Sequence, residues 1–492
     1  MSNPTAVSRV RERIVRKNFD PTATTDQIIV DQSAQRVEPH DSTHPDAASD
    51  NATEPVNKVP SPGRLVVFAL QHLLVMYAST VTVPVVVSAA LDLSRADLVY
   101  LVTADLLLCG FGTLLQSLGI WKVGVKLPMV IGASYTGIAP MLIIGQGEGL
   151  QTMYGSVLVV GLATIAIAPL VSKLMRFFPP VVIGTTILLI GIQLIPAGGK
   201  MIVGSDPDDP GFASPAKIGL AAATALAIVL CYCLLPRALR PISVLIGMIV
   251  GVVVAALTGM FDGSGIGEGA AFSFPDLLHF GVPRFDLLAI CSLALIQIVL
   301  IVELAGQVNA VGEVVGQKVS RDRLAAAVRA DGVVTALGGG VFQSFMYVTF
   351  AQNVGILTIT RMFSRYVTAL TGAMLMCLAF FPVVGEVVAA IPRPVLGAAA
   401  VVMFGTIAVV GIRILGRVDY SQNSNVIITA AAIGVALLPI TINGFYSQFP
   451  TAAKQVLSSG AAVGIFVAIA LNLLFTMRRH DGAEKVNSDD VA

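Results

Sequence analysis

The segment at residues 349–361 reads TFAQNVGILTITR and lies between two long apolar stretches of the chain. It places an amide pair, a glycine and three threonines where side chains facing lipid would be expected. A second segment, KLPMVIGASYTGIAP at residues 126–140, is also short, and Gly, Ser, Thr and Pro interrupt it. The sequence around these two segments indicates why polar side chains stand there.

The composition is that of a protein with many membrane-spanning segments. The chain has 492 residues, of which 55% are hydrophobic and 12% are charged, whereas a soluble domain carries about 25% charged residues. The mean hydropathy is +0.82. The formal net charge of +1 lacks the basic excess that a nucleic-acid-binding face requires. The expected surroundings are therefore the lipid bilayer, and nucleic acid is excluded as a partner.

The apolar residues fall into about fourteen segments of spanning or near-spanning length, since a helix needs roughly twenty residues to cross a bilayer. They cover residues 65–90, 96–118, 127–145, 150–170, 181–197, 216–235, 241–260, 286–308, 324–342, 348–361, 365–384, 394–414, 424–442 and 459–477. Residues 1–60 are rich in Asp, Thr, Ser, Pro and Ala and predict a disordered cytoplasmic tail. Residues 61–478 would form the transmembrane domain, and residues 479–492 a second cytoplasmic tail.

Loop charges test this count and predict the orientation. If both termini are cytoplasmic, every loop on that side is basic, through Lys122 and Lys126, Lys173 and Arg176, Arg237 and Arg240, Lys318 with Arg321 and Arg323, Arg361 and Arg365, and Arg413 and Arg417. The opposite loops hold the acidic runs at residues 206–209 and 262–268. This distribution follows the positive-inside rule and predicts an even number of spans.

The two irregular segments are the third and the tenth, seven segments apart. Paired broken segments at corresponding positions of two halves indicate an inverted-repeat transporter with its substrate site near the membrane midplane. Non-helical backbone is tolerated at that depth only where it is buried in protein or lines a cavity. Gly and Pro can also serve helix packing in membranes, but a matched pair favours a site.

Four ionisable residues lie inside predicted spans, where a charge costs at least about 2.5 to 3.5 kcal/mol. Glu303 is the strongest candidate for a functional role, because no basic residue lies within two turns of it and a carboxylate accepts hydrogen bonds from neighbouring N–H groups. That property suits a neutral heterocycle carried with a proton. For Asp105 we expect a structural role. Asp331 is either a site residue or a hydrogen-bond partner at a helix end. His72, beside Gln71, is either a packing residue or part of a polar patch.

The amides of the tenth segment suit one kind of ligand. Gln352 and Asn353 each offer donors and an acceptor, which an oxopurine edge of alternating N–H and C=O groups requires. Phe350 and Tyr135 offer flat apolar faces for stacking, and Gly355 permits a close backbone approach. These segments contain no cation placed to bind an anion, which favours a neutral base over sulfate or bicarbonate.

Nothing in the sequence indicates catalysis or a metal. The five cysteines lie in apolar runs and are predicted to be packing residues. No metal-ligand spacing, Gly-x-Ser-x-Gly elbow or pair of catalytic aspartates is present. We therefore expect no enzyme activity, no metal and no cofactor.

The segment AQNVGILTITR resembles the signature of the nucleobase-ascorbate transporter family, Gln/Glu-Asn-x-Gly-x-x-x-x-Thr-Arg/Lys/Gly, through Gln352, Asn353, Gly355, Thr360 and Arg361. The similarity extends over nearly the whole span region and includes Gln71 with His72, Glu303, the ADG at residues 330–332 and the SRYV at residues 364–367. It looks closest to bacterial xanthine and uric acid permeases, whose motif begins with Gln, whereas uracil permeases usually begin it with Glu.

The resemblance implies an all-α polytopic fold of fourteen spans in two inverted seven-helix repeats, divided into a core and a gate domain, with short strands in the third and tenth segments. Members are plasma-membrane symporters, proton-coupled or in some animals sodium-coupled, and commonly homodimers. Implied functions are uptake of xanthine or uric acid, or, as alternatives, transport of uracil or another nucleobase, or anion exchange by the same architecture.

The resemblance also implies roles for individual residues. Glu303 and Gln352 would bind the base directly, with the backbone at Ala351 and Tyr135 and stacking from Phe350. Asn353 would support the site, and Asp331 and His72 would shape it or affect coupling.

Overall fold

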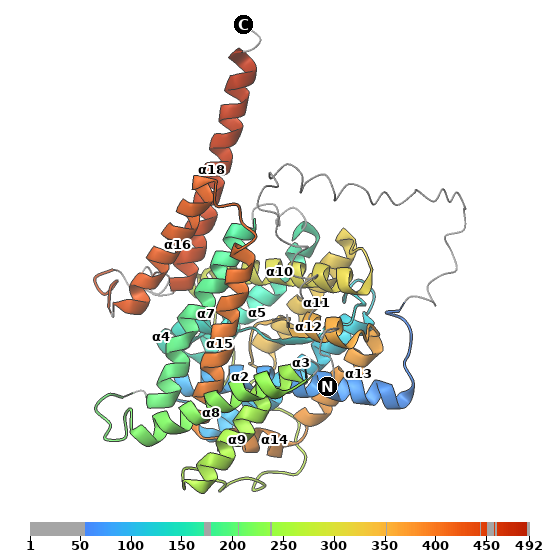
Figure 1. Ribbon diagram of the computed structural model, residues 1–492, viewed down its shortest axis with the longest axis vertical. Coiled ribbons are helices and arrows are strands. Elements are labelled where there is room, and N and C mark those ends of the chain that lie inside the picture. The colour runs from blue at the N-terminus through green and yellow to red at the C-terminus, as the bar shows by residue number, and fades with distance from the viewer. Residues whose placement is uncertain are drawn as a thin grey trace, which may run out of the picture. The chain divides into compact units, whose positions relative to one another are not determined.

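The computed structural model describes residues 55–171, 179–204, 206–236, 239–350, 352–442, 444–449, 457 and 460–489. These residues are mostly helical (Figure 1). The first half contains α2 (Pro62–Ala90), α3 (Arg95–Leu118), β1 (Ile131–Ala133), α4 (Ile138–Gly147), α5 (Leu150–Ile167), η1 (Ala168–Leu170), α7 (Pro180–Val203), α8 (Pro215–Leu234), η3 (Arg240–Ile242) and α9 (Ser243–Leu257). The second half contains α10 (Leu287–Val315), α11 (Arg321–Gly340), β2 (Tyr347–Thr349), α12 (Gln352–Thr360), α13 (Arg365–Ala379), α14 (Pro382–Ala390), α15 (Arg393–Leu415), α16 (Asn423–Thr441) and α18 (Gly460–Asp489).

Several of these helices can cross a membrane. Eight helices in the described residues are long and apolar enough, and α13 with α14 would make a ninth if that bent pair is one span. Shorter apolar helices lie at Ile138–Gly147, Ser243–Leu257 and Val463–Thr476. The protein is thus a helical, multi-pass membrane protein, and the count of fourteen spans stays a prediction.

The predicted span at residues 365–384 is wrong at its end. Helix α13 stops at Ala379, and α14 begins at Pro382 with a bend of 80° between the two. Proline has no N–H to donate and is favoured in the first turn of a helix. Pro382 therefore starts a new helix instead of continuing the old one, a change that hydropathy alone does not register.

Two short strands replace helix in the third and tenth segments. Strands β1 and β2 pair antiparallel, with Ile131 opposite Thr349 and Ala133 opposite Tyr347. Both strands are buried, and the helices α4 and α12 follow them. The pairing satisfies backbone groups that are buried in the protein, away from water.

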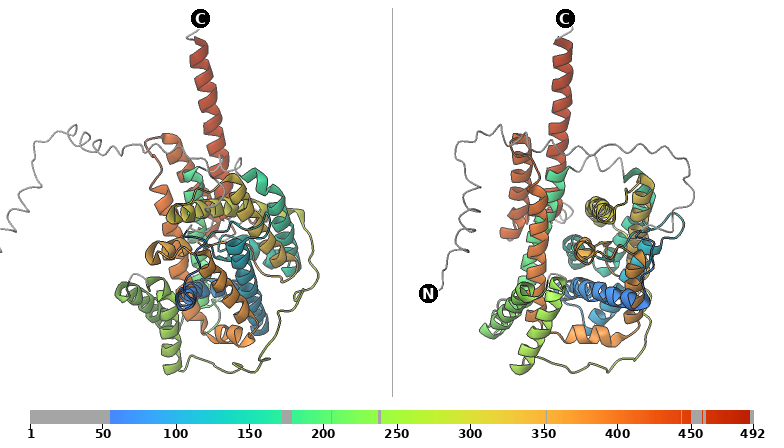
Figure 2. Two further views of the ribbon diagram at one scale, coloured as in Figure 1. Left: turned by 90° about the vertical axis from the view of Figure 1, so that its right-hand side faces the viewer. Right: turned by 45° about the vertical axis from the view of Figure 1, so that its right-hand side comes forward.

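The helices form two groups. In one group α3 packs against α13 and α5 against α11, with α2, α10 and the two strands beside them. In the other group α7 packs along α15, and α8, α9, α16 and α18 adjoin this pair. The right-hand view of Figure 2 shows the α7–α15 pair and the first group on opposite sides. The strands therefore lie in the group opposite the α7–α15 pair.

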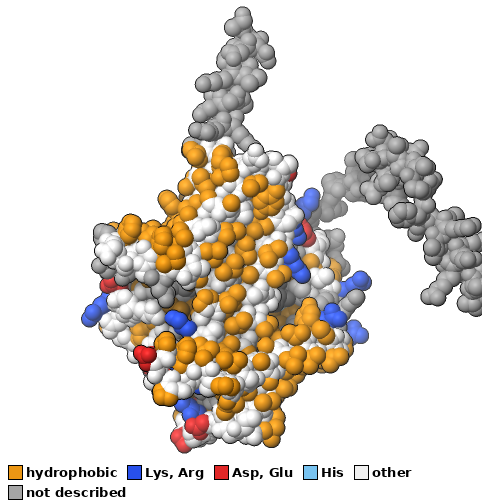
Figure 3. Space-filling model, turned by 60° about the vertical axis from the view of Figure 1, so that its left-hand side comes forward, with side chains coloured by type: hydrophobic (Ala, Val, Ile, Leu, Met, Phe, Trp, Pro, Cys, Tyr) orange, Lys and Arg blue, Asp and Glu red, His pale blue; other side chains and the backbone are white. Residues whose placement is uncertain are grey.

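The outer face of the second group is apolar. Hydrophobic side chains are spread over much of the face in Figure 3. Exposed apolar residues of α8, α15 and α16 include Leu226, Leu230, Leu234, Val409, Ile412, Val426 and Ile427. An exposed apolar surface of this extent is expected where a protein contacts lipid. It agrees with a membrane location.

The folded region starts before residue 61. Val56 is buried, and its carbonyl accepts a hydrogen bond from the Arg365 N–H at 3.0 Å. Val56 therefore packs against the folded region, residues 1–54 lie outside the described residues, and the tail boundary at residue 60 stays a prediction. At the other end α18 continues as a helix through Asp489, across most of the predicted C-terminal tail.

Candidate functional site

A cavity of about 540 Å³ lies between the two groups of helices. From the first group it is lined by α2, α10 and the residues around β1 and β2, and from the second by α7, α8, η3, α9 and α15. Its lining includes Ser79, Ala133, Ser134, Tyr135, Thr136, Glu303, Val348, Thr349, Phe350, Met403 and Thr406. The two broken segments therefore supply one wall of the cavity, which is the placement that irregular backbone within a membrane requires.

Glu303 is the one carboxylate among the described residues that line the cavity. It projects from α10 and is half-buried. Its Oε1 accepts a hydrogen bond from Gln307 Nε2 at 3.1 Å, and its Oε2 lies 3.5 Å from the Thr136 hydroxyl that donates to it. A carboxylate can accept about four hydrogen bonds. Glu303 thus keeps acceptor capacity that faces the cavity.

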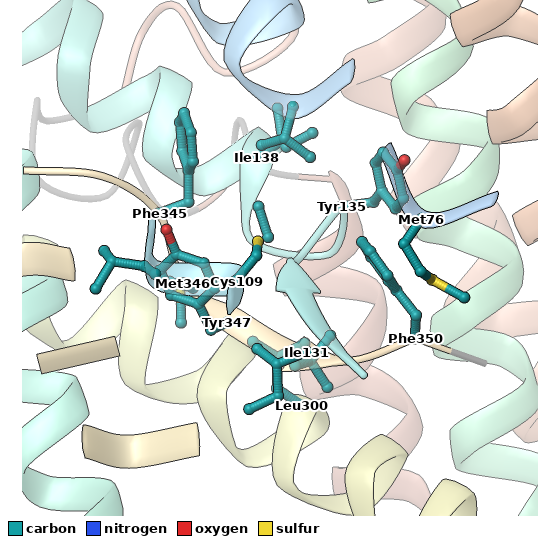
Figure 4. Close-up of a cluster of buried hydrophobic side chains, with 14 of the residues drawn as sticks. Met76, Cys109, Ile131, Tyr135, Ile138, Leu300, Phe345, Met346, Tyr347 and Phe350 are labelled. Atoms are coloured by element: carbon teal, nitrogen blue, oxygen red, sulfur yellow. The ribbon is translucent and has the colours of Figure 1, made fainter. Parts of the chain in front are cut away.

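Two aromatic rings form the wall beside Glu303. The centroids of Tyr135 and Phe350 are 6.4 Å apart with the rings inclined by 25°, and Figure 4 shows the two side chains next to each other. The Tyr135 hydroxyl donates to the Ser79 carbonyl at 2.7 Å. Phe404 meets Tyr135 edge-on, with centroids 6.0 Å apart. These contacts fix a flat apolar surface of the kind on which planar rings stack.

Gly132 makes room for the Phe350 ring. A Cβ atom added at Gly132 would overlap the Phe350 ring atoms, whereas one added at Gly355 would meet nothing within 4 Å. Gly132 lies on β1, which pairs with β2, and the close backbone approach expected at Gly355 stays a prediction. Gly355 is exposed on α12.

Two hydroxyl groups of the cavity wall were not predicted. Ser134 Oγ and Thr349 Oγ1 are buried, line the cavity and have no hydrogen-bond partner within the described residues. A buried polar group without a partner is costly, and each hydroxyl has hydrogen-bonding capacity that a polar molecule in the cavity can satisfy. Both lie in the two broken segments, but sequence alone does not tell which side chains of so short a strand face a cavity.

The remaining signature residues support the backbone. Asn353 is fully buried, and its amide donates to the Pro128 carbonyl at 2.6 Å, so it ties α12 to the chain before β1. The Thr360 hydroxyl donates to the Ile356 carbonyl at 2.8 Å, and Arg361, with φ of 51°, ends the helix. Ala351 and the side chain of Gln352 lie outside the described residues.

The other predicted ionisable residues lie away from the cavity lining. The Asp331 carboxylate accepts a hydrogen bond from Gln116 Nε2 at 2.8 Å, linking α11 to α3. Asp105 accepts one from the Tyr347 hydroxyl at 2.8 Å. His72 is fully buried with Nδ1 2.9 Å from the Phe68 carbonyl oxygen, and Gln71 beside it is half-buried. Each of the three ionisable groups thus contacts protein rather than the cavity.

The site can bind a flat polar molecule. It combines a carboxylate acceptor, free hydroxyls and an aromatic wall in one cavity. Within the described residues no group of three or more His, Cys, Asp or Glu side chains could hold a metal ion. Paired broken segments that line a cavity between two helix groups are typical of membrane transport proteins.

Comparison with known proteins defines the family. Residues 63–445 match the permease family Xan_ur_permease, and the chain belongs to this family, so it is a permease and not an enzyme. It is 34% identical to the uric acid transporter UacT of Escherichia coli (strain K12), over 88% of this chain and 90% of that protein. It is 32% identical to the xanthine permease of Bacillus subtilis (strain 168), over 84% of this chain and 94% of that one.

Solved structures share the fold at low sequence identity. The murine anion transporter Slc26a9 in its inward-facing state superposes with a TM-score of 0.58 and 14% identity, over 94% of this chain and 76% of that one. The transmembrane domain of a cyanobacterial bicarbonate transporter, BicA, superposes with a TM-score of 0.51 and 13% identity, over 85% and 99%. At such identities the likeness concerns the fold alone.

Proposed function

We propose that the protein takes up an oxopurine, xanthine or uric acid or both, together with a proton across the plasma membrane. The observation that carries the proposal is Glu303, a carboxylate with free acceptor capacity beside the Tyr135–Phe350 wall. The carboxylate suits the N–H groups of a base, and the wall suits its ring. The names of the relatives, a uric acid transporter and a xanthine permease, support the same substrate class. No cofactor is needed, because the proton is the coupling ion.

The architecture we propose has fourteen spans in two inverted repeats, with both termini cytoplasmic. Helix packing supports it. When each span is exchanged with the span seven places away in the chain, the α3–α13 contact becomes the α11–α5 contact. The α7–α15 and β1–β2 contacts are unchanged by the same exchange. The group with the strands would be the core, and the group around α7 and α15 the gate. Assembly as a homodimer is also part of the proposal.

Anion exchange by the same architecture is less favoured. The two broken segments contain no cation placed to bind an anion, and the carboxylate in the described lining of the cavity is Glu303. Uracil transport is the other alternative, and the first experiment must distinguish it from purine transport.

The first experiment measures uptake of radiolabelled xanthine, uric acid and uracil by cells that lack their own permeases, with and without a protonophore. We expect xanthine or uric acid to enter, the protonophore to abolish entry, and Gln352→Glu to impair it. Entry of uracil alone would overturn the purine assignment, and entry that ignores the protonophore would overturn proton coupling.

The free hydroxyl of Ser134 provides a second test. A neutral hydrogen bond contributes about 0.5 to 1.5 kcal/mol, so Ser134→Ala should weaken binding of the transported base by roughly twofold to tenfold. Thr406→Val is the matched control, because the Thr406 hydroxyl lines the cavity but already donates to the Val402 carbonyl at 2.9 Å. Equal binding by Ser134→Ala and wild type in nanodiscs would remove Ser134 from the site.

A further inference from the structure

The gate group contributes a chemically distinct part of the cavity lining. Tyr232 near the end of α8 and Arg240 in η3 belong to it, together with Ser243 and Val244 at the start of α9. Arg240 is the one basic residue among the described residues that line the cavity. The cavity thus has a carboxylate where the broken segments meet and a guanidinium where α8 and α9 are joined.

Arg240 is held in place without being neutralised. Its Nε donates to the Leu235 carbonyl at 3.4 Å, and its Cζ lies 5.5 Å from the centre of the Tyr232 ring. Ion pairs in the described part of the chain involve only His279, so no carboxylate there pairs with Arg240. A guanidinium has five N–H donors, and a cation–π contact does not use their hydrogen-bonding capacity. Most donors of Arg240 are thus available to a ligand.

We infer that Arg240, positioned by Tyr232, forms a second binding site in the same cavity, which takes the anionic form of an oxopurine. This inference rests on the proposed function and on the proposed orientation, which places the α8–α9 connection in the cytoplasm. A planar anion with ring carbonyl oxygens matches a guanidinium in charge and in hydrogen-bond geometry. The guanidinium attracts the anion toward the α8–α9 connection, and the Glu303 carboxylate repels it. Arg240 thus serves release to the cytoplasm and binding from that side.

Sidedness gives the first test. Urate half-saturation is measured from outside in whole cells and from the cytoplasmic side in inside-out membrane vesicles, for wild type, Arg240→Gln and Arg240→Lys. Because a charged hydrogen bond is lost, Arg240→Gln should raise the cytoplasmic-side value about tenfold and leave the outside value little changed. Arg240→Lys keeps the positive charge but lacks the planar guanidinium. Its cytoplasmic-side half-saturation value should lie between those of the wild type and Arg240→Gln. Arg413→Gln is the matched control, because Arg413 is exposed on the last turn of α15 and does not line the cavity.

Charge selectivity gives the second test. Near neutral pH urate is an anion and xanthine is largely neutral, so Arg240→Gln should weaken urate binding in nanodiscs more than xanthine binding. Equal loss for both bases, or an equal rise on both sides of the membrane, would place Arg240 in the central site and overturn the inference. Unchanged values in Arg240→Gln would also overturn it. Failure of the wild type to bind either base would instead overturn the proposed function, and this inference with it.

Discussion

Replacing Glu303 by glutamine should abolish accumulation of the transported base. The two carboxylate oxygens already contact Thr136 and Gln307 and face the cavity with acceptor capacity to spare. An amide keeps the shape of the side chain but replaces one acceptor oxygen by an N–H donor. Where that donor faces an N–H group of the base, no hydrogen bond can form. A hydrogen bond to a charged group contributes roughly 1.5 to 3 kcal/mol, so binding should weaken about tenfold to hundredfold. The amide also cannot take up the coupling proton.

The measurement is uptake in cells together with base binding by purified protein in nanodiscs. Glu313→Gln is the matched control, because Glu313 lies on the same helix, α10, but is exposed and outside the cavity. We expect Glu313→Gln to behave as the wild type. Full accumulation by Glu303→Gln would show that neither base binding nor coupling depends on this carboxylate.

Hydropathy predicted the positions of most helices closely. A predicted span at residues 394–414 corresponds to α15 (Arg393–Leu415), and one at 96–118 to α3 (Arg95–Leu118). This success follows from the bilayer, which requires long apolar stretches with internally satisfied backbone. The bend before Pro382 was missed because both sides of it are apolar. The burial of Val56 was missed because a single apolar residue in a polar segment carries no periodic signal.

The site was only partly predictable. Glu303 was selected because it is an unpaired acid in an apolar run, and the structure brings it to one cavity with Tyr135 and Phe350. Their roles in binding stay predictions. The free hydroxyls of Thr349, at the end of β2, and of Ser134, directly after β1, emerge only from the structure, which places both on the cavity wall. Three-residue strands are too short for alternation of polar and apolar residues to indicate a face.

The glycine that matters most for the site should be Gly132. In Gly132→Ala the new methyl group would occupy the position of the Phe350 ring, so the ring must move toward the cavity or the two strands must separate. Overpacking of this kind costs typically about 1 to 3 kcal/mol. We therefore expect a lower melting temperature and roughly tenfold weaker base binding. Both are measured on purified protein in nanodiscs.

Gly355→Ala is the matched control for Gly132→Ala. Gly355 belongs to the family signature, yet an added Cβ there meets open space, so the variant should match the wild type in stability and binding. Gly132→Ala combined with Phe350→Leu removes the overlapping ring and should recover stability but not binding, because the stacking surface is then lost. Should Gly132→Ala alone retain wild-type stability and binding, the Phe350 ring does not rest on Gly132 and the aromatic wall is arranged differently.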